Sequence, residues 1–162
     1  MGINLADLAH TPFQDGGRDP RRGLDCWGLV MEVLRRFGSL VPDYGAGLSA
    51  FDSAGIAAIF ETVTLPPGDK RGQEPFSPGV NEPPRFMAEK APVPFYRVDE
   101  SRPGDVAALA IDARLPGLVQ HFGVVLDGGR FIHVLKKQGV CCHSLGHPWL
   151  GPKIKGFYRW TR

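Results

Sequence analysis

The chain has 162 residues, of which 43% are hydrophobic and 22% are charged, and its formal net charge is +2. These values fit one globular domain, residues 1–162, with a hydrophobic core, and so small a net charge gives no reason to expect a nucleic-acid partner. No apolar run is long enough to span a bilayer and residues 1–10 lack the basic start and apolar centre of a secretory signal, so we expect synthesis in the cytoplasm and no membrane partner.

The N-terminal part is predicted to contain a short helix, a loop and then a longer helix. Residues 5–23 are rich in turn-forming residues. From residue 26 to residue 37, apolar side chains recur at helical spacing. Asp25 suits the N-cap of this helix, and Gly38 suits its end. Cys26 is therefore expected in the first turn of a buried helix.

The middle of the chain is predicted to hold a second helix and a proline-rich insertion. Residues 49–62 include apolar side chains that roughly share one helical face. Nine prolines between residues 65 and 103 exclude a long helix or a central strand there. We interpret the stretch from about 65 to 100 as an insertion, which is either a plain surface excursion or the wall of a substrate cleft.

The C-terminal part has the pattern of strands. We predict strands at residues 105–111, 119–126 and 130–135, with Asp127-Gly128-Gly129 as a hairpin turn, and two further candidate strands at 140–143 and 154–160. Helices that come first and antiparallel strands that follow predict an α+β domain.

The hairpin carries two histidines, His121 and His133, whose relative orientation depends on the turn. With a three-residue turn and Gly129 in the left-handed conformation, Gly123 lies opposite His133. Both histidines then project from the same side of the sheet as diagonal neighbours, and Gly123 leaves room beside them. A two-residue turn would place them on opposite faces.

A cysteine and two histidines in this order form a candidate catalytic set. A thiol at a helix start faces unpaired backbone N–H groups, which favour the reactive thiolate. Taken alone, Cys26 is more often a small buried hydrophobe, and the two histidines could be partly exposed residues without a role. Acyl transfer, however, requires a thiol, an imidazole base and a polar group that orients the base. We therefore assign Cys26 as nucleophile, His121 as general base and His133 as orienting residue.

The sequence does not favour a metal or a cofactor. His121 and His133 are too few for a closed zinc site, and no acidic residue flanks them. A second cluster of potential ligands lies nearer the C-terminus: Cys141, Cys142, His143 and His147. Adjacent cysteines rarely both reach one ion, and on a strand they point to opposite faces. We expect no metal and no cofactor.

Several ordered motifs together resemble one known family. Residues 24–30, Leu-Asp-Cys-Trp-Gly-Leu-Val, are similar to the Asp-Cys-x-Gly-Leu-Val nucleophile motif of NlpC/P60 peptidases, which are papain-like. Residues 102–106 resemble that family's Pro-Gly-Asp strand start, and residues 121–126 and 131–134 resemble its two histidine strands. The separation 133 − 121 = 12 matches that between the family's base and its orienting residue. The C-terminal residues 148–159 look most like the branch found in phage tails and gene-transfer particles.

The resemblance implies a nucleophile-bearing helix packed on an antiparallel sheet, and hydrolysis of amide bonds in peptidoglycan stem peptides. It implies peptidoglycan peptides as partners, and possible association with other phage-tail proteins in a virion or tail that acts in the cell wall or periplasm. The oxyanion would lie near the backbone N–H of Cys26. Two alternatives stay open: a tail-tip structural protein with little activity, and an amidase or acyltransferase on another amide or ester.

The chain departs from the family pattern at two positions close to the nucleophile. Many relatives carry a tyrosine where this chain has Phe13, and a small residue where it has Trp27. The missing hydroxyl of Phe13 and the bulk of Trp27 affect the expected rate and substrate more than the fold. Together with Asp25, these residues are our candidates for substrate binding or oxyanion support.

Overall fold

Helices come first along the chain and most strands come later, as the sequence predicts. The computed structural model describes residues 3–65 and 95–160. The helical elements are η1 (Ala6–Leu8), α1 (Cys26–Arg36), α2 (Ser53–Val63) and η2 (Gly151–Lys153). The strands are β1 (Arg18–Asp19), β2 (Gly23–Leu24), β3 (Thr64–Leu65), β4 (Phe95–Val98), β5 (Val106–Leu109), β6 (His121–Leu126), β7 (Arg130–Leu135), β8 (Gly139–Ser144) and β9 (Ile154–Trp160).

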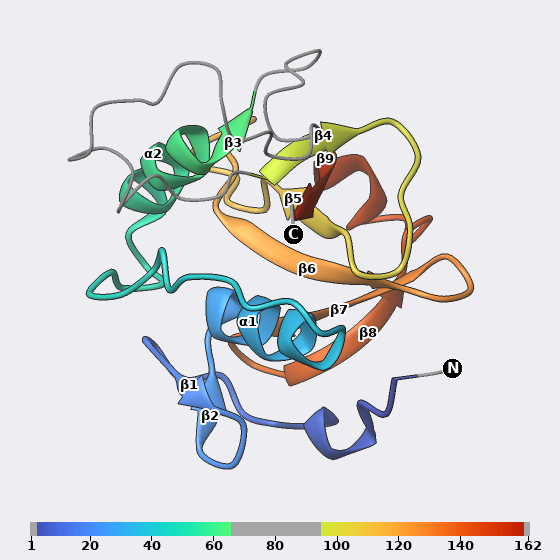
Figure 1. The fold of residues 1–162 in the computed structure, drawn as a ribbon. Coiled ribbons are helices and arrows are strands. Elements are labelled where there is room, and N and C mark those ends of the chain that lie inside the picture. The colour runs from blue at the N-terminus through green and yellow to red at the C-terminus, as the bar shows by residue number, and fades with distance from the viewer. Residues whose placement is uncertain (1–2, 66–94, 161–162) are drawn as a thin grey trace, which may run out of the picture.

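The main sheet has seven strands in the order β3-β4-β9-β5-β6-β7-β8 (Figure 1). Every neighbouring pair in it is antiparallel except the short pair β3–β4, which is parallel. Strands β1 and β2 form a separate hairpin before α1. The predicted α+β class is confirmed, whereas the short strands β1 to β4 were missed because two to four residues carry too little alternation to be recognised.

Helix α1 begins and ends where the sequence predicts. The Asp25 side chain accepts a hydrogen bond from the Gly28 N–H at 2.7 Å, as an N-cap does. At the other end, Gly38 adopts φ +82°, and its N–H donates to the Arg35 carbonyl. The buried apolar side of the helix consists of Leu29, Val30, Val33 and Leu34.

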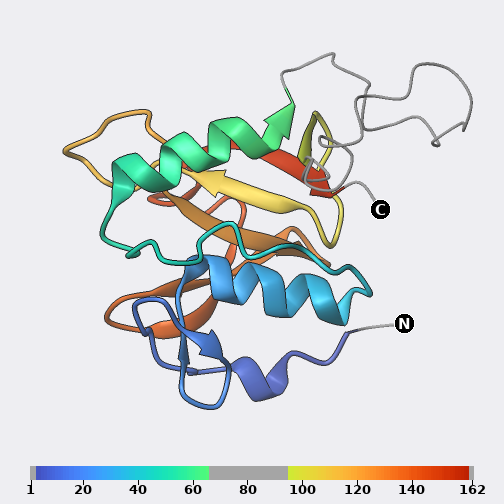
Figure 2. The same ribbon diagram turned by 60° about the vertical axis from the view of Figure 1, so that its left-hand side comes forward.

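Both helices cover the same face of the sheet, side by side (Figures 1 and 2). Phe122 of β6 contacts both of them, because its ring lies 5.6 Å from that of Trp27 in α1 and 5.5 Å from that of Phe60 in α2. Helix α2 begins four residues later than predicted, since Asp52 caps it by accepting from the Gly55 N–H at 2.9 Å.

The opposite face of the sheet carries a second, smaller core. Val125 and Phe131 pack there with Leu150 from the loop before η2. Side chains alternate along a strand, so Phe122 and Val124 face the helices while His121 and Val125 face this second core. The two faces therefore have different neighbours, which matters for the histidines.

The hairpin between β6 and β7 has the predicted register. Leu126 pairs with Arg130 and Gly123 pairs with His133, and Gly129 has φ +67°. The three-residue turn is thus confirmed. The prediction that His121 and His133 project from the same face of the sheet depends on this turn length.

The Pro-Gly-Asp segment ties the start of β5 to β9. The Asp105 side chain is 2% exposed and accepts from the Arg102 N–H at 2.7 Å. Two nitrogens of Arg159 in β9 each donate to it at 2.8 Å. A bidentate pair of this kind fixes the position of two neighbouring strands.

The proline-rich stretch is described only at its ends. Residues 95–98, which fall within the predicted insertion, form β4 and pair with β3 on one side and β9 on the other. The expectation that this stretch holds no central strand is therefore wrong for these four residues, none of which is a proline. The rest of that prediction, residues 66–94, lies outside the described residues. None of the helices within residues 3–65 and 95–160 has the length and hydropathy needed to cross a membrane.

Candidate active site

A cleft opens at the end of the sheet where α1 and β6 begin and β7 ends. Its wall includes Cys26, the first residue of α1, and His121, the first residue of β6. The residues that line the same cleft include Phe13, Phe51 and Lys136. Because His121 lies on the sheet face turned away from α1, the two residues share the cleft around the strand ends and not across the sheet.

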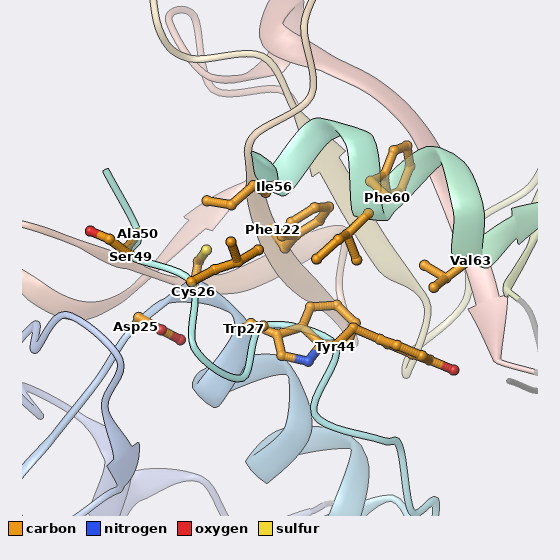
Figure 3. Close-up of a pocket in the computed structure, with 13 residues that line it drawn as sticks. Asp25, Cys26, Trp27, Tyr44, Ser49, Ala50, Ile56, Phe60, Val63 and Phe122 are labelled. Carbon is orange, nitrogen blue, oxygen red and sulfur yellow. The ribbon is translucent and has the colours of Figure 1, made fainter. Parts of the chain in front are cut away.

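Cys26 lies between this cleft and an apolar inner pocket, which it also lines. In Figure 3 its side chain lies near Ala50 at one end of the inner pocket, and Val63 lies at the other end. Only 7% of the residue is exposed. Cys26 is therefore covered by apolar side chains on one side and lines the cleft on the other.

Burial changes the ionisation of the Cys26 thiol. Its pKa is raised to about 12, first by the loss of hydration and then by the neighbouring Asp25 carboxylate, while the backbone N–H groups of Phe122 and Trp27 oppose the rise. The expectation that the helix start favours the thiolate is therefore wrong for this structure. Desolvation outweighs these backbone hydrogen bonds, so the thiol is the favoured form at neutral pH.

The imidazoles form a hydrogen-bonded row. His121 Nε2 lies 3.0 Å from His133 Nδ1, and His133 Nε2 lies 2.8 Å from His143 Nδ1. The ring of His147 lies beside that of His143, with 5.0 Å between centroids. The prediction that His121 and His133 are diagonal neighbours on one face is confirmed, and His143 of β8 extends the row.

Two tautomer assignments satisfy the row, one with the proton of each ring on Nε2 and one with it on Nδ1, and the first suits a base at His121. If each Nε2 carries the proton, His121 donates to His133, and His133 donates to His143. His121 Nδ1 is then the unprotonated nitrogen that remains for another partner. Burial lowers the pKa of His121 to about 4, with a further contribution from the charge of Lys136, so the ring is neutral at neutral pH and can accept a proton.

His133 is the innermost residue of the row and is fully buried. Burial lowers its pKa to about 3, and the neighbouring imidazoles lower it as well. Space for it comes from Gly123, where an added Cβ would lie 2.7 Å from the Ile132 carbonyl oxygen and 3.1 Å from the His133 Cβ. The sequence-based argument that Gly123 leaves room opposite His133 agrees with this geometry.

Comparison with known proteins identifies the family. The model of the NlpC/P60 family matches residues 10–159. The chain belongs to the NlpC/P60 family. A search of the curated proteins finds no match.

Solved structures of NlpC/P60 proteins share this fold. An NLP/P60-family protein from Staphylococcus aureus subsp. aureus Mu50, described as similar to a lipoprotein, aligns with a TM-score of 0.53 and 15% identity over 100% of this chain and 44% of its own. An NlpC/P60 family protein from Bacillus cereus ATCC 10987 aligns with a TM-score of 0.54 and 17% identity over 100% of this chain and 42% of its own. The present chain therefore spans less than half the length of either protein.

In this NlpC/P60 chain, Asp25 holds the helix start in place. Besides capping Gly28, its carboxylate pairs with Arg18 Nη1 at 2.7 Å. Arg18 also binds Asp43, with its Nε at 2.9 Å and its Nη2 at 3.0 Å from the two carboxylate oxygens. Both oxygens of Asp25 are thus engaged, and its observed contacts position Cys26 without reaching into the cleft.

There is a steric reason for glycine at residue 28, two positions after Cys26. A Cβ on Gly28 would lie 2.1 Å from the carbonyl oxygen of Gly17, so the loop before β1 packs directly on the helix backbone. That contact leaves no room for any side chain at residue 28 and fixes the start of α1 against the N-terminal segment.

Phe13 and Trp27 occupy different environments. Phe13 lines the cleft and packs edge-to-face against Phe51, with 6.1 Å between ring centroids. Trp27 points into the inner pocket, packs against Phe122 and donates from its indole N–H to the Pro42 carbonyl at 3.4 Å. Of the two, Phe13 is therefore placed to touch a ligand in the cleft.

Lys136 and Gln120 are among the cleft residues that the sequence analysis missed. The Lys136 ammonium lies 3.6 Å from the centroid of the Phe51 ring and brings a positive charge to the cleft. Gln120 is 7% exposed and accepts from the Ile111 N–H at 3.1 Å, while its Nε2 has no hydrogen-bond partner among the described residues. The sequence signal for Gln120 is its position directly before His121.

Proposed function

We propose that this chain is a cysteine endopeptidase that hydrolyses amide bonds in peptidoglycan stem peptides. The observation that carries the proposal is the shared cleft of Cys26 and His121, with the His121 ring held by His133 through a 3.0 Å hydrogen bond. Thiol, base and orienting group are the parts that acyl transfer requires. Membership of the NlpC/P60 family supports the same reaction class.

The proposed reaction has two stages. In the first, the Cys26 sulfur attacks the amide carbonyl carbon while His121 Nδ1 takes the thiol proton, and the C–N bond then breaks as His121 returns that proton to the leaving amine. In the second, water attacks the thioester and gives a proton to His121, which passes it to the departing sulfur. The products are a carboxylic acid and an amine, and the residues end as they began.

The free protein starts from a protonated thiol, so the first stage must include transfer of the thiol proton. Because Cys26 is uncharged and His121 is neutral before attack, the proton moves as the S–C bond forms. His133 accepts from His121 Nε2 and stabilises the imidazolium that results. The backbone N–H of Cys26, at the start of α1, is our candidate donor to the oxyanion.

The cleft has features that fit a stem peptide. Such peptides carry free carboxylates and short aliphatic side chains. Lys136 supplies a positive charge in the cleft, and Phe13 and Phe51 supply an apolar wall. We therefore propose that Lys136 binds a carboxylate of the substrate.

The decisive experiment is digestion of purified cell-wall fragments, followed by mass spectrometry to identify the new amino termini. We expect stem-peptide cleavage by the intact protein and none by Cys26→Ala or His121→Ala proteins of unchanged circular dichroism. Cleavage by the Cys26→Ala protein would end the proposed mechanism. Intact fragments with every wall type tested would favour a structural protein, and release of a product other than a cleaved peptide would favour another amide or ester substrate.

We also propose that the chain acts as part of a phage tail or similar particle, because residues 148–159 resemble that branch of the family. Antibodies against the chain should then detect it in purified particles from cells that produce it. Its presence in those cells but not in the particles would contradict this setting and leave the peptidase proposal unaffected.

A further inference from the structure

We propose that His133, Cys141 and His143 form a binding site for a zinc-like transition-metal ion, and that the bound ion switches off the base His121. The binding part stands on the geometry of strands β7 and β8. The switching part rests on the proposed peptidase function.

Pairing of β7 with β8 brings the three side chains together. Cys141 lies directly opposite His133, and His143 lies two residues further along β8, so all three project from one face. Their possible ligand atoms all lie within 4.8 Å of one another. His133 is buried, whereas Cys141 and His143 are partly exposed on the strand that ends the sheet order. An ion can therefore approach from the β8 side.

The set of ligands selects the kind of ion. Two imidazoles and one thiolate suit zinc and other borderline or soft transition metals, and do not suit magnesium or calcium, which prefer oxygen. Three protein ligands leave the fourth tetrahedral position open to water. Nitrogens bound to one zinc lie about 3.3 Å apart, which follows from Zn–N bonds of about 2.05 Å. His133 Nε2 and His143 Nδ1 are now 2.8 Å apart, so the rings need to part only slightly.

This set differs from the one that the sequence suggested. The sequence argument against a metal was that Cys141 and Cys142 cannot both reach one ion, and their alternation along β8 agrees with it. In the structure, the set of ligands includes His133 from the neighbouring strand β7 and does not include Cys142. His147 lies close to these ligands but is not counted as one of them. Its Nδ1 already accepts from the backbone N–H groups of Trp149 and Leu150.

Metal binding reverses the tautomers of the histidine row. The proposed reaction needs His121 Nδ1 unprotonated, and in the row this places the His133 proton on Nε2, which then donates to His143 when no ion is bound. An ion on His133 Nε2 needs that lone pair, so the proton of the neutral ring must sit on Nδ1. A metal-bound histidine usually donates its other N–H to a neighbouring acceptor, which here is His121 Nε2.

The reversal disables His121. With Nε2 accepting from His133, the neutral His121 ring carries its proton on Nδ1, the nitrogen that would take the proton of the Cys26 thiol. Neither ring gains or loses a proton in total, and one proton leaves the Cys141 thiol as it binds the ion. The ion thus acts on the reaction through the protonation pattern of His121 and without touching the substrate.

The first test measures binding without any need for activity. Cobalt(II) is titrated into Cys26→Ala protein, in which the reactive thiol cannot compete, and the absorption of a cobalt–thiolate bond is followed. We expect this band in Cys26→Ala and in Cys26→Ala/Cys142→Ser protein, and its loss in Cys26→Ala/Cys141→Ser protein. Its absence from the first, or its loss with Cys142 and not with Cys141, overturns the site. Zinc added afterwards should remove the band by displacing cobalt.

The second test measures the switch. Loss of a general base typically costs 10²–10⁴-fold, so saturating zinc should slow hydrolysis by the wild-type protein by at least about 100-fold, and a chelator should restore it. Each variant is compared with its own metal-free rate, and Cys141→Ser protein should need far more zinc than Cys142→Ser protein. If zinc inhibited both variants equally, the inhibition would be assigned to Cys26 and the switch would be overturned. Cobalt binding without inhibition of hydrolysis would also overturn the switch. Metal-free protein that hydrolyses nothing would count against the proposed function alone, because the cobalt result is independent of it.

Discussion

Nε2 of His121 lies 3.0 Å from Nδ1 of His133, so the second histidine occupies one nitrogen of the first, while the other has no hydrogen-bond partner among residues 3–65 and 95–160. This relationship decides which nitrogen can serve Cys26. It also makes His133 a positioning residue, since its effect on the thiol passes through His121.

The role of His133 can be tested with two substitutions, one that removes the ring and one that keeps a hydrogen-bond acceptor. We expect His133→Ala to lower kcat by about 10²–10³-fold with little change in KM, because the His121 ring loses its fixed tautomer and orientation. His133→Gln, whose amide oxygen can accept from Nε2, should recover part of the loss. Steady-state kinetics on a purified stem peptide give both constants. Equal losses in the two variants, or a change in KM alone, would contradict the positioning role.

Labelling of the thiols should depend on pH in a specific way. Because burial raises the pKa of Cys26 to about 12, little thiolate exists at pH 7, and iodoacetamide should modify Cys26 more slowly than the exposed Cys142. The Cys26 rate should keep rising with pH beyond about 8.5, the ordinary pKa of a cysteine. Peptide mapping by mass spectrometry separates the sites, and Cys142→Ser protein provides the control. Faster labelling of Cys26 at pH 7 would show that its pKa is lowered.

Two glycines at equivalent helix positions offer a matched comparison. Gly28 and Gly55 are each the third residue of a helix, and each donates its N–H to the capping aspartate. A Cβ at residue 28 would meet the backbone oxygen of Gly17 at 2.1 Å, whereas at residue 55 its nearest contact is the side chain of Asp52. Gly28→Ala should therefore lower the free energy of unfolding by about 2–3 kcal/mol, and Gly55→Ala should change it by less than about 1 kcal/mol. Denaturant unfolding measures both, and similar values would refute the steric argument.

The ion pair between Asp105 and Arg159 should matter for stability far more than a surface pair does. Arg159→Met leaves the buried Asp105 carboxylate without its two 2.8 Å hydrogen bonds and should cost about 3–5 kcal/mol. The control is Arg114→Met, which removes a 2.7 Å pair with Asp112 from a side chain that is 86% exposed, and should leave the free energy of unfolding nearly unchanged. Chemical denaturation at neutral pH gives both values. A loss below about 1 kcal/mol for Arg159→Met would show that Asp105 is solvated despite its burial.

Much of the candidate site could be predicted because its parts are local. The N-cap at Asp25 depends on residues three positions apart, and the shared face of His121 and His133 depends on the length of one turn. Both features depend on residues that are close together in the chain, so they can be predicted from residue types and their spacing. The short strands β3 and β4 could not be recognised in the same way, because their pairing depends on partners distant in sequence.

By itself, the sequence determined the helix that begins at Cys26, the hairpin with both histidines on one side, and the family to which these motifs belong. Only the tertiary structure decided that Cys26 is desolvated and protonated, that Phe13 lines the cleft while Trp27 does not, and that His143 and Cys141 lie beside His133. The physical reason is the range of the forces involved. Hydrogen bonding within a turn is set by a few consecutive residues, whereas loss of hydration is set by every segment that packs around an atom.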